Sequence, residues 1–191
     1  MKSAKKTPVS AADSMWNILE LEWFSKNSYN LAIKNLPRWY PRYSLRMLIC
    51  CIDFINQYPK DISQEVSDDS SLRKLFCEFC AATALVSLAR GGDIIEEQYQ
   101  DYLNARKHVA SFDDLLQEKI NKMEDASAHD LVQKLAILLA FDFEAACQLK
   151  AWDDLGEIIL KAEVCKCIRT YELMADCILS CHPPNKPPTQ S

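Results

Sequence analysis

The sequence predicts an all-α fold of stacked helical hairpins with seven to eight helices. Apolar residues recur at helical spacing in successive segments, no segment alternates as a strand does, and the 191 residues include only 3 glycines. The segments fold back on themselves at three turns, near residues 37–41, 91–93 and 150–153. Because such hairpins cannot bury themselves alone, we expect them to stack on one another.

Composition and charge exclude several classes of protein. Hydrophobic residues make up 49% and charged residues 26%, which is ordinary for one globular domain. The net charge of −5 gives no general attraction to nucleic acid or to an anionic membrane. The longest apolar run, Leu135 to Phe141, is far too short to span a bilayer, and the basic start lacks the apolar run of a signal peptide. We therefore expect no membrane association.

We divide the chain into a flexible N-terminal tail (1–12), a helical-repeat domain (13–182) and a disordered, proline-rich C-terminal tail (183–191). The first helix is expected to begin at Asp13 or Ser14, either of which can cap exposed backbone N–H groups.

The first hairpin turns at 37–41, where prolines stand at both ends of the turn. Within its first helix, Trp23 and Phe24 follow the apolar spacing and are expected in the core. The second helix is expected over about 42–57, because apolar residues repeat at helical spacing and Pro59 stops it.

The second hairpin follows a polar linker expected over 60–71. A widely apolar helix should run from Ser71 or Leu72 to Arg90, sandwiched between its neighbours. Gly91 and Gly92 are expected to end it in the left-handed conformation, and Asp93 to cap the next helix. Ser111 and Asp114 resemble a weak capping box for a further short helix to about Met123.

The third hairpin follows a polar break at 124–129 and a long helix over about 130–150, and it turns at Trp152 to Asp154. Helices over about 155–164 and 166–180 complete the fold. Leu155, Ile159 and Ala162 have the spacing of the second helix of a tetratricopeptide-type repeat, although leucine replaces the small opening residue. The turns lie further apart than the roughly 34-residue period of regular repeats, so the repeats would be degenerate.

Several segments resemble a meiotic family, the sporulation-specific, Zip-four-type tetratricopeptide scaffolds. The stretch Leu21 to Ile33 (LEWFSKNSYNLAI) is similar to the family's "glutamate-tryptophan-leucine-alanine, then aromatic-asparagine-x-alanine" segment. Residues 143–146, 151–155 and 171–176 are similar to its closing repeats. Phe24 and Ser25 depart from the pattern, since the family favours leucine and alanine there.

The resemblance covers about residues 15 to 180 as scattered positions, and family members are much longer, so this chain would correspond to a C-terminal part. It implies a nuclear scaffold that gathers recombination proteins and promotes crossover formation and synapsis. Without it, the residues themselves indicate nucleus or cytosol, because nine cysteines in apolar helical stretches read as reduced thiols.

A metal site is the alternative reading of the cysteines. Cys77 and Cys80 form a CxxC pair, and further ligands could come from the far end of the chain, at Cys165, Cys167, Cys177, Cys181 and His182. The pair lies inside an apolar helix without a nearby glycine or histidine, so we interpret it as core and predict no metal ligands and no cofactor.

The chain carries no motif of a catalytic nucleophile with its base, so we predict that it is not an enzyme. The three histidines (His108, His129 and His182) are interpreted as solvated or end-capping groups. The acidic pairs at 68–69, 113–114 and 153–154 are interpreted as helix caps, where carboxylates oppose the positive end of the helix dipole.

The stretch from Lys34 to Arg46 interleaves basic residues with Trp39, Tyr40 and Tyr43. Tryptophan, tyrosine and arginine dominate protein-binding hot spots, and basic residues with aromatics also suit single-stranded nucleic acid. A third reading is that the rings pack the turn while the arginines are solvated. We predict a scaffold whose partners are other proteins, bound through Arg38, Trp39, Tyr40 and Arg42; a helical domain that binds nucleic acid through the same stretch is the less favoured alternative.

Overall fold

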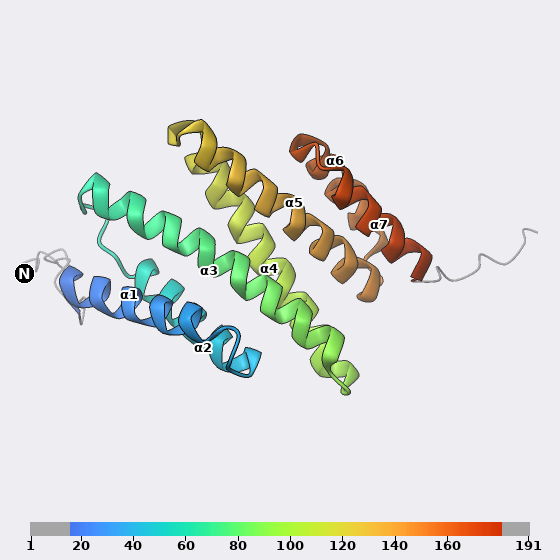
Figure 1. The fold of residues 1–191 in the computed structure, drawn as a ribbon, viewed down its shortest axis with the longest axis horizontal. Helices are drawn as coiled ribbons and strands as arrows, with labels where there is room; N and C mark the ends of the chain where they lie inside the picture. Colours follow the sequence, from blue (N-terminus) through green and yellow to red (C-terminus); the bar gives the residue numbers. More distant parts are fainter. Residues whose placement is uncertain (1–15, 181–191) are drawn as a thin grey trace, which may run out of the picture.

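The computed structural model describes residues 16–180, which form a stack of helical hairpins (Figure 1). The seven α-helices are α1 (Ile18–Asn35), α2 (Pro41–Asn56), α3 (Gln64–Gly91), α4 (Ile95–Lys119), α5 (Asp125–Gln148), α6 (Leu155–Cys165) and α7 (Ile168–Ser180). Two short 3₁₀ helices, η1 (Ile120–Lys122) and η2 (Trp152–Asp154), lie between them, and residues 16–180 contain no strand. The predicted all-α hairpin stack is confirmed. The two predicted tails, 1–12 and 183–191, lie outside the described residues.

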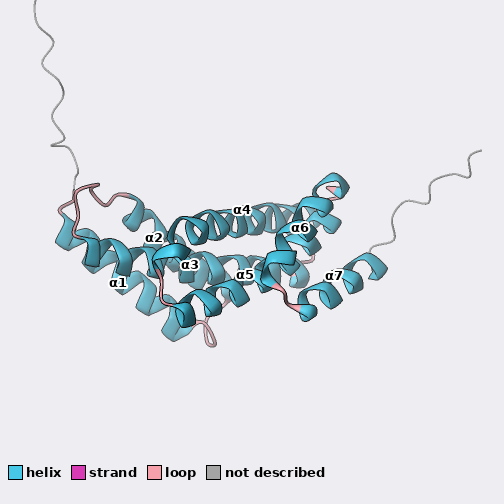
Figure 2. Cartoon of the chain, turned by 90° about the horizontal axis from the view of Figure 1, so that it is seen from above, coloured by secondary structure: helices cyan, strands magenta, loops and turns pink. Residues whose placement is uncertain are grey.

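Each helix packs mainly against the next one along the chain, from α1 on α2 through to α5 on both α6 and α7. Helices α1, α3, α5 and α7 form one layer, with α2, α4 and α6 behind them (Figure 2). Helices α1 and α7 lie at opposite ends, so the arrangement is an open stack and not a closed bundle (Figure 1). The three predicted hairpin turns fall between α1 and α2, α3 and α4, and α5 and α6.

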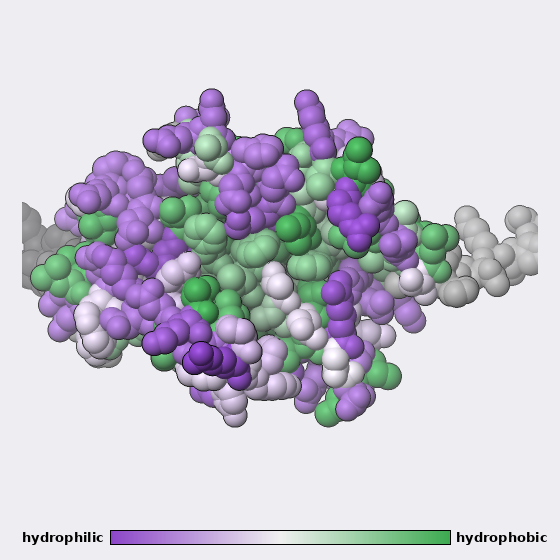
Figure 3. All heavy atoms as spheres, in the orientation of Figure 1, coloured by the Kyte–Doolittle hydropathy of each residue, from purple (hydrophilic) through white to green (hydrophobic). Residues whose placement is uncertain are grey.

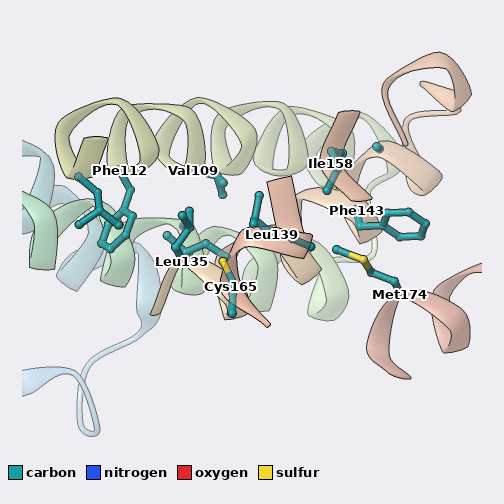
Figure 4. Close-up of a cluster of buried hydrophobic side chains, with 14 of the residues drawn as sticks. Val109, Phe112, Leu135, Leu139, Phe143, Ile158, Cys165 and Met174 are labelled. Atoms are coloured by element: carbon teal, nitrogen blue, oxygen red, sulfur yellow. The ribbon is translucent and has the colours of Figure 1, made fainter. Parts of the chain in front are cut away.

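Two groups of buried apolar side chains form the core, and α3 contributes to both. One joins α1 and α2 to α3 and also includes residues of α4 and α5. The other joins α3 to α4, α5, α6 and α7. In Figure 4, labelled side chains of the second group point toward one another from four helices: Val109, Phe112, Leu135, Leu139, Phe143, Ile158, Cys165 and Met174. The hairpins therefore share continuous cores.

Helix α1 begins later than predicted, at Ile18. Asn17 caps it, since its side chain accepts from the Glu20 backbone N–H at 3.0 Å while the Glu20 carboxylate accepts from the Asn17 N–H at 2.9 Å. The predicted caps, Asp13 and Ser14, lie outside the described residues. The expectation that Trp23 is buried was wrong, because 61% of its surface is exposed.

The predicted linker at 60–71 was wrong over its second half, because α3 already begins at Gln64. Ser63 caps the helix by accepting from the Val66 backbone N–H at 3.4 Å, and the following polar residues form its first turns. Helix α3 ends at the expected glycines, but Gly92 has the extended angles φ −80° and ψ 149°. The predicted Asp93 cap was also wrong: Ile94 precedes the first turn of α4, without a side-chain cap.

Helix α4 is one continuous helix of 25 residues, so the capping box predicted at Ser111 was wrong. One buried stripe runs along the whole helix and favours continuity over a break; its members are Tyr102, Ala105, Val109, Phe112 and Leu116. The polar break at 124–129 is likewise mostly helix, since α5 begins at Asp125.

In the third hairpin, Ala162 is fully buried as the repeat spacing predicted. Ile159 is 37% exposed, whereas Ile158 is only 3% exposed and occupies the inner face. Lys166 then turns the chain into α7 with a left-handed backbone, φ 49°. The buried isoleucine of α6 therefore stands one residue before the predicted position, whereas Ala162 stands where it was predicted.

A buried polar cluster joins the first hairpin to α3. Ser25, fully buried in α1, donates to the Glu22 carbonyl at 3.0 Å and lies 2.7 Å from the Tyr58 hydroxyl. It also accepts from Nη1 of the buried Arg73 at 3.2 Å, and Arg73 pairs with Asp69. The Ser25 hydroxyl is therefore a hydrogen-bond partner of the partly buried Tyr58 hydroxyl and of the buried Arg73 guanidinium, and alanine would remove it from both.

Replacing Ser25 with alanine should lower the free energy of unfolding by about 1–3 kcal/mol, because Tyr58 and Arg73 lose a buried hydrogen-bond partner. Urea unfolding measures the change. The matched control is Ser28→Ala on the same helix, where the side chain is half-buried and the expected change is within about 0.5 kcal/mol. Equal effects of the two substitutions would contradict a role for the cluster.

Candidate partner-binding surface

The turn between α1 and α2 is held by its own backbone and by proline. The backbone N–H groups of Arg38 and Trp39 both donate to the Asn35 carbonyl, at 2.9 and 2.8 Å. Tyr40 then adopts φ −58° and ψ 132°, and Pro41 takes the first helical position of α2, where its missing N–H is not needed. The aromatic residues of the turn are thereby placed at the start of a rigid helix.

Aromatic side chains surround a hollow at this turn. Trp39, Tyr43, Arg46 and Met47 line an open hollow of about 470 Å³. Tyr40 and Tyr43 are 59% and 58% exposed, and their rings meet edge to face with centroids 6.3 Å apart. Trp39, Tyr43 and Met47 stand at four-residue spacing, so they share one side of the turn and α2. Sequence reasoning missed Met47, because its four-residue spacing from Tyr43 points to a binding surface only once the hollow is known.

The charge around the hollow is one-sided. From Trp23 to Ile52 the sequence contains five basic residues and no acidic one, in a chain whose net charge is −5. Two of the five are neutralised by acids outside the segment, since Lys26 pairs with Glu22 and Arg42 pairs with α4. The other three (Lys34, Arg38 and Arg46) form no ion pair with another residue among 16–180.

Arg42 plays a different part from Arg38. Its guanidinium donates two hydrogen bonds to the Asp101 carboxylate on α4, at 3.2 and 3.1 Å, and a third to Glu97 at 3.2 Å. Asp101 is only 4% exposed, and the two carboxylates raise the pKa of Arg42 against the opposing effect of burial. The structure therefore places Arg42 in a clamp between α2 and α4, turned toward the second hairpin.

A second hollow, of about 400 Å³, gathers charged groups from α4, α5 and α6. Arg106 bridges Asp142 and Asp154, each at 2.7 Å, while Lys161 lies 3.4 Å from Asp113. Burial raises the pKa of Asp142 although Arg106 opposes that shift. Because these charges satisfy one another across helices, the arrangement is that of an interhelix ion-pair network.

Two of the three acidic pairs do not stand at helix starts as predicted, and the third stands at one without a capping hydrogen bond. Residues 68–69 lie inside α3 and residues 113–114 inside α4. Asp154 stands before α6 but caps nothing with its side chain, which pairs with Arg106. The interpretation of His108 was also wrong: it lies in the middle of α4, with Nδ1 2.5 Å from Oε2 of the buried Glu78 on α3. His182 lies outside the described residues.

Cys51, Cys77, Cys147 and Cys165 are buried in the reduced form, as predicted for core cysteines. Cys50, Cys80, Cys167 and Cys177 are partly buried, and Cys181 lies outside the described residues. Burial and the neighbouring Cys51 thiol raise the pKa of Cys77 well above its ordinary value, which keeps it protonated. Residues 16–180 contain no group of three or more His, Cys, Asp or Glu side chains that could hold a metal ion.

The face shown in Figure 3 carries a second apolar region, over the middle of the stack. Leu72 and Ile137 are 40% and 42% exposed on α3 and α5. The Lys134 ammonium lies over the rings of Phe76 and Phe79, at 5.5 and 6.0 Å from their centroids. Since Lys134 already covers these two rings, the turn hollow is the more open aromatic surface.

Comparison with protein-family models, curated proteins and solved structures found no match. Within residues 16–180, each helix is too short or too polar to cross a membrane.

The two arginines of the turn should respond differently to removal. Arg42→Ala is expected to lower the free energy of unfolding by about 2–4 kcal/mol, because it leaves the buried Asp101 carboxylate without its partner. Arg38→Ala should change it by no more than about 0.5 kcal/mol, since Arg38 is exposed and unpaired among the described residues. Thermal and urea unfolding compare the two variants, and a smaller loss for Arg42→Ala than for Arg38→Ala would refute the clamp.

Proposed function

We propose that this chain is a non-enzymatic scaffold that binds other proteins through the turn surface, which comprises Arg38, Trp39, Tyr40, Tyr43, Arg46 and Met47. The observation that carries the proposal is an exposed aromatic hollow flanked by uncompensated arginines on a rigid helical stack. Tryptophan, tyrosine and arginine dominate the binding energy of protein interfaces, because their large side chains fill well-packed pockets from which water is excluded. Arg42 was predicted from the sequence as part of this surface; we propose instead that it supports the surface by fixing α2 to α4 through Asp101.

The open arrangement of the hairpins supports the same proposal. Stacked hairpins present extended surfaces whose parts are fixed relative to one another, and this is the property that repeat scaffolds use in binding. The burial of Ala162 within the third hairpin also agrees with the spacing of a degenerate tetratricopeptide-like repeat. The α3–α4 hairpin, from Gln64 to Lys119, is longer than a regular repeat of roughly 34 residues, in keeping with insertions between units.

The cellular setting that we propose rests on the resemblance to the meiotic Zip-four-type scaffolds. By that resemblance the chain acts in the nucleus, where it gathers recombination proteins for crossover formation and synapsis. Ser25, which departs from the family's preferred alanine, has a local explanation in its contacts with Tyr58 and Arg73.

Nucleic-acid binding through the same turn is the second candidate, because Lys34, Arg38 and Arg46 could contact phosphates while the rings stack on bases. The net charge of −5 disfavours it, since a polyanion would be repelled by the rest of the chain. Salt separates the two candidates: contacts to phosphates make affinity fall steeply as salt is added.

A pull-down from meiotic nuclear extract tests the proposal. Trp39→Ala and Tyr40→Ala should each lose most of the recovered partner protein, because each removes a ring from the hot spot. Tyr171→Ala is the matched control, as Tyr171 is an exposed tyrosine on α7, at the other end of the stack from α1. If the folded Trp39 and Tyr40 variants recover the partner as well as the unmodified chain does, the turn is not the binding surface.

A further inference from the structure

The turn surface selects for a particular chemistry in its partner. We infer that it binds a short acidic segment of another protein, in which one large apolar side chain is flanked by aspartate or glutamate. This inference rests on the proposed function and adds the chemical class of the partner. Three features of the surface support it: the shape of the hollow, the charge beside it, and the charge of the remaining chain.

The hollow suits an apolar anchor. Its lining includes the indole of Trp39, the ring of Tyr43 and the thioether of Met47, and the one charged group that lines it is Arg46. The three groups span nine residues, from Trp39 in the turn to Met47, and the part on α2 between Tyr43 and Met47 is roughly 6 Å long. A strip of this length accommodates one or two side chains of an extended or helical segment, and methionine adapts to anchors of different shape.

The positive charge of Arg38 and Arg46 favours acidic residues on both sides of that anchor. Arg46 lines the hollow and Arg38 directly precedes Trp39, and neither forms an ion pair with another described residue. Arginine binds carboxylates through two parallel N–H donors, so a carboxylate beside the anchor would gain charge-assisted hydrogen bonds.

The distribution of charge along the chain would direct an acidic segment to the turn surface. The basic segment from Trp23 to Ile52 is set within a chain of net charge −5. An acidic segment is therefore repelled by most of the surface and attracted to the first hairpin. Such complementarity speeds association and excludes wrong orientations. A long nucleic acid would extend from the turn onto acidic surface, which favours a short peptide.

A random 16-residue peptide library displayed on phage and selected against the full 191-residue chain tests the inference without assuming a sequence. The selected peptides should be enriched in aspartate and glutamate around one aromatic or long aliphatic residue. A fluorescein-labelled peptide of the consensus sequence is then titrated with the chain, and binding is followed by fluorescence polarisation.

Arg46→Glu should weaken that peptide at least about tenfold, because attraction becomes repulsion. Trp39→Ala should weaken it similarly, whereas Trp39→Phe, which keeps a ring, should retain part of the affinity. Lys107→Glu is the control: it makes the same charge change at an exposed lysine on α4, and the expected change is within about twofold. A peptide with lysine in place of its acids should bind Arg46→Glu better than the unmodified chain. Circular dichroism checks that each variant is folded.

Other outcomes would overturn the inference in separable ways. Selected peptides that depend on Trp39 but lack acidic residues would keep the proposed function and refute the acidic partner. Selection of no peptide that depends on Trp39 would refute both. Tighter binding of a labelled 16-nucleotide single-stranded DNA than of the consensus peptide, with the same dependence on Arg46, would assign the surface to nucleic acid.

Discussion

The structure depends on the burial of α3 along most of its circumference. Twelve of its residues are buried, and eight of them belong to the two groups of core side chains. Alanines at 81, 82, 84 and 89 allow neighbouring helices to approach closely, and Leu75, Leu85 and Val86 fill the space between them. A helix buried in this way cannot be removed without exposing both cores, so it makes one cooperative body of three hairpins.

The candidate surface takes its geometry from that body. Helix α2 packs on α3 and is tied to α4 by the Arg42 clamp, so the residues that follow the turn are fixed from two sides. Prolines on both sides of the turn limit the conformations of the backbone there. A surface that is already ordered loses little conformational entropy on binding, which favours affinity from a small hot spot.

The sequence predicted the helices and the hairpins, because apolar spacing and the turn residues act locally. The predictions were wrong where the polarity of a segment does not match its burial in the folded structure. Residues 64–71 look like a linker, yet they form helix, in which Ser70 is buried; Arg73, just after them, donates a hydrogen bond to Ser25 of the first hairpin. Trp23 has core spacing and still faces outward at the end of the stack, where no further hairpin covers it among the described residues.

The candidate surface was predicted only in part, because local patterns are visible in the sequence and long-range contacts are not. Trp39 and Tyr40 could be singled out because an aromatic and basic cluster at a turn is visible in the chain itself. The separation of Arg42 from Arg38 could not, because it depends on Asp101, which is 59 residues away in sequence. Met47 contributes through helical spacing that becomes meaningful only when the hollow is known.

Native-state hydrogen exchange tests most directly whether α3 unites the stack into one body that presents a preformed surface. If α3 unites the hairpins into one cooperative body, the amides of residues 75–89 exchange only through global unfolding. The amides of residues 45–52 on α2 then share the same opening free energy. Amides of α2 that exchange through a separate opening of much lower free energy, while α3 to α5 stay protected, would contradict it. The first hairpin would then be an independent unit and its turn surface would not be held by the rest of the fold.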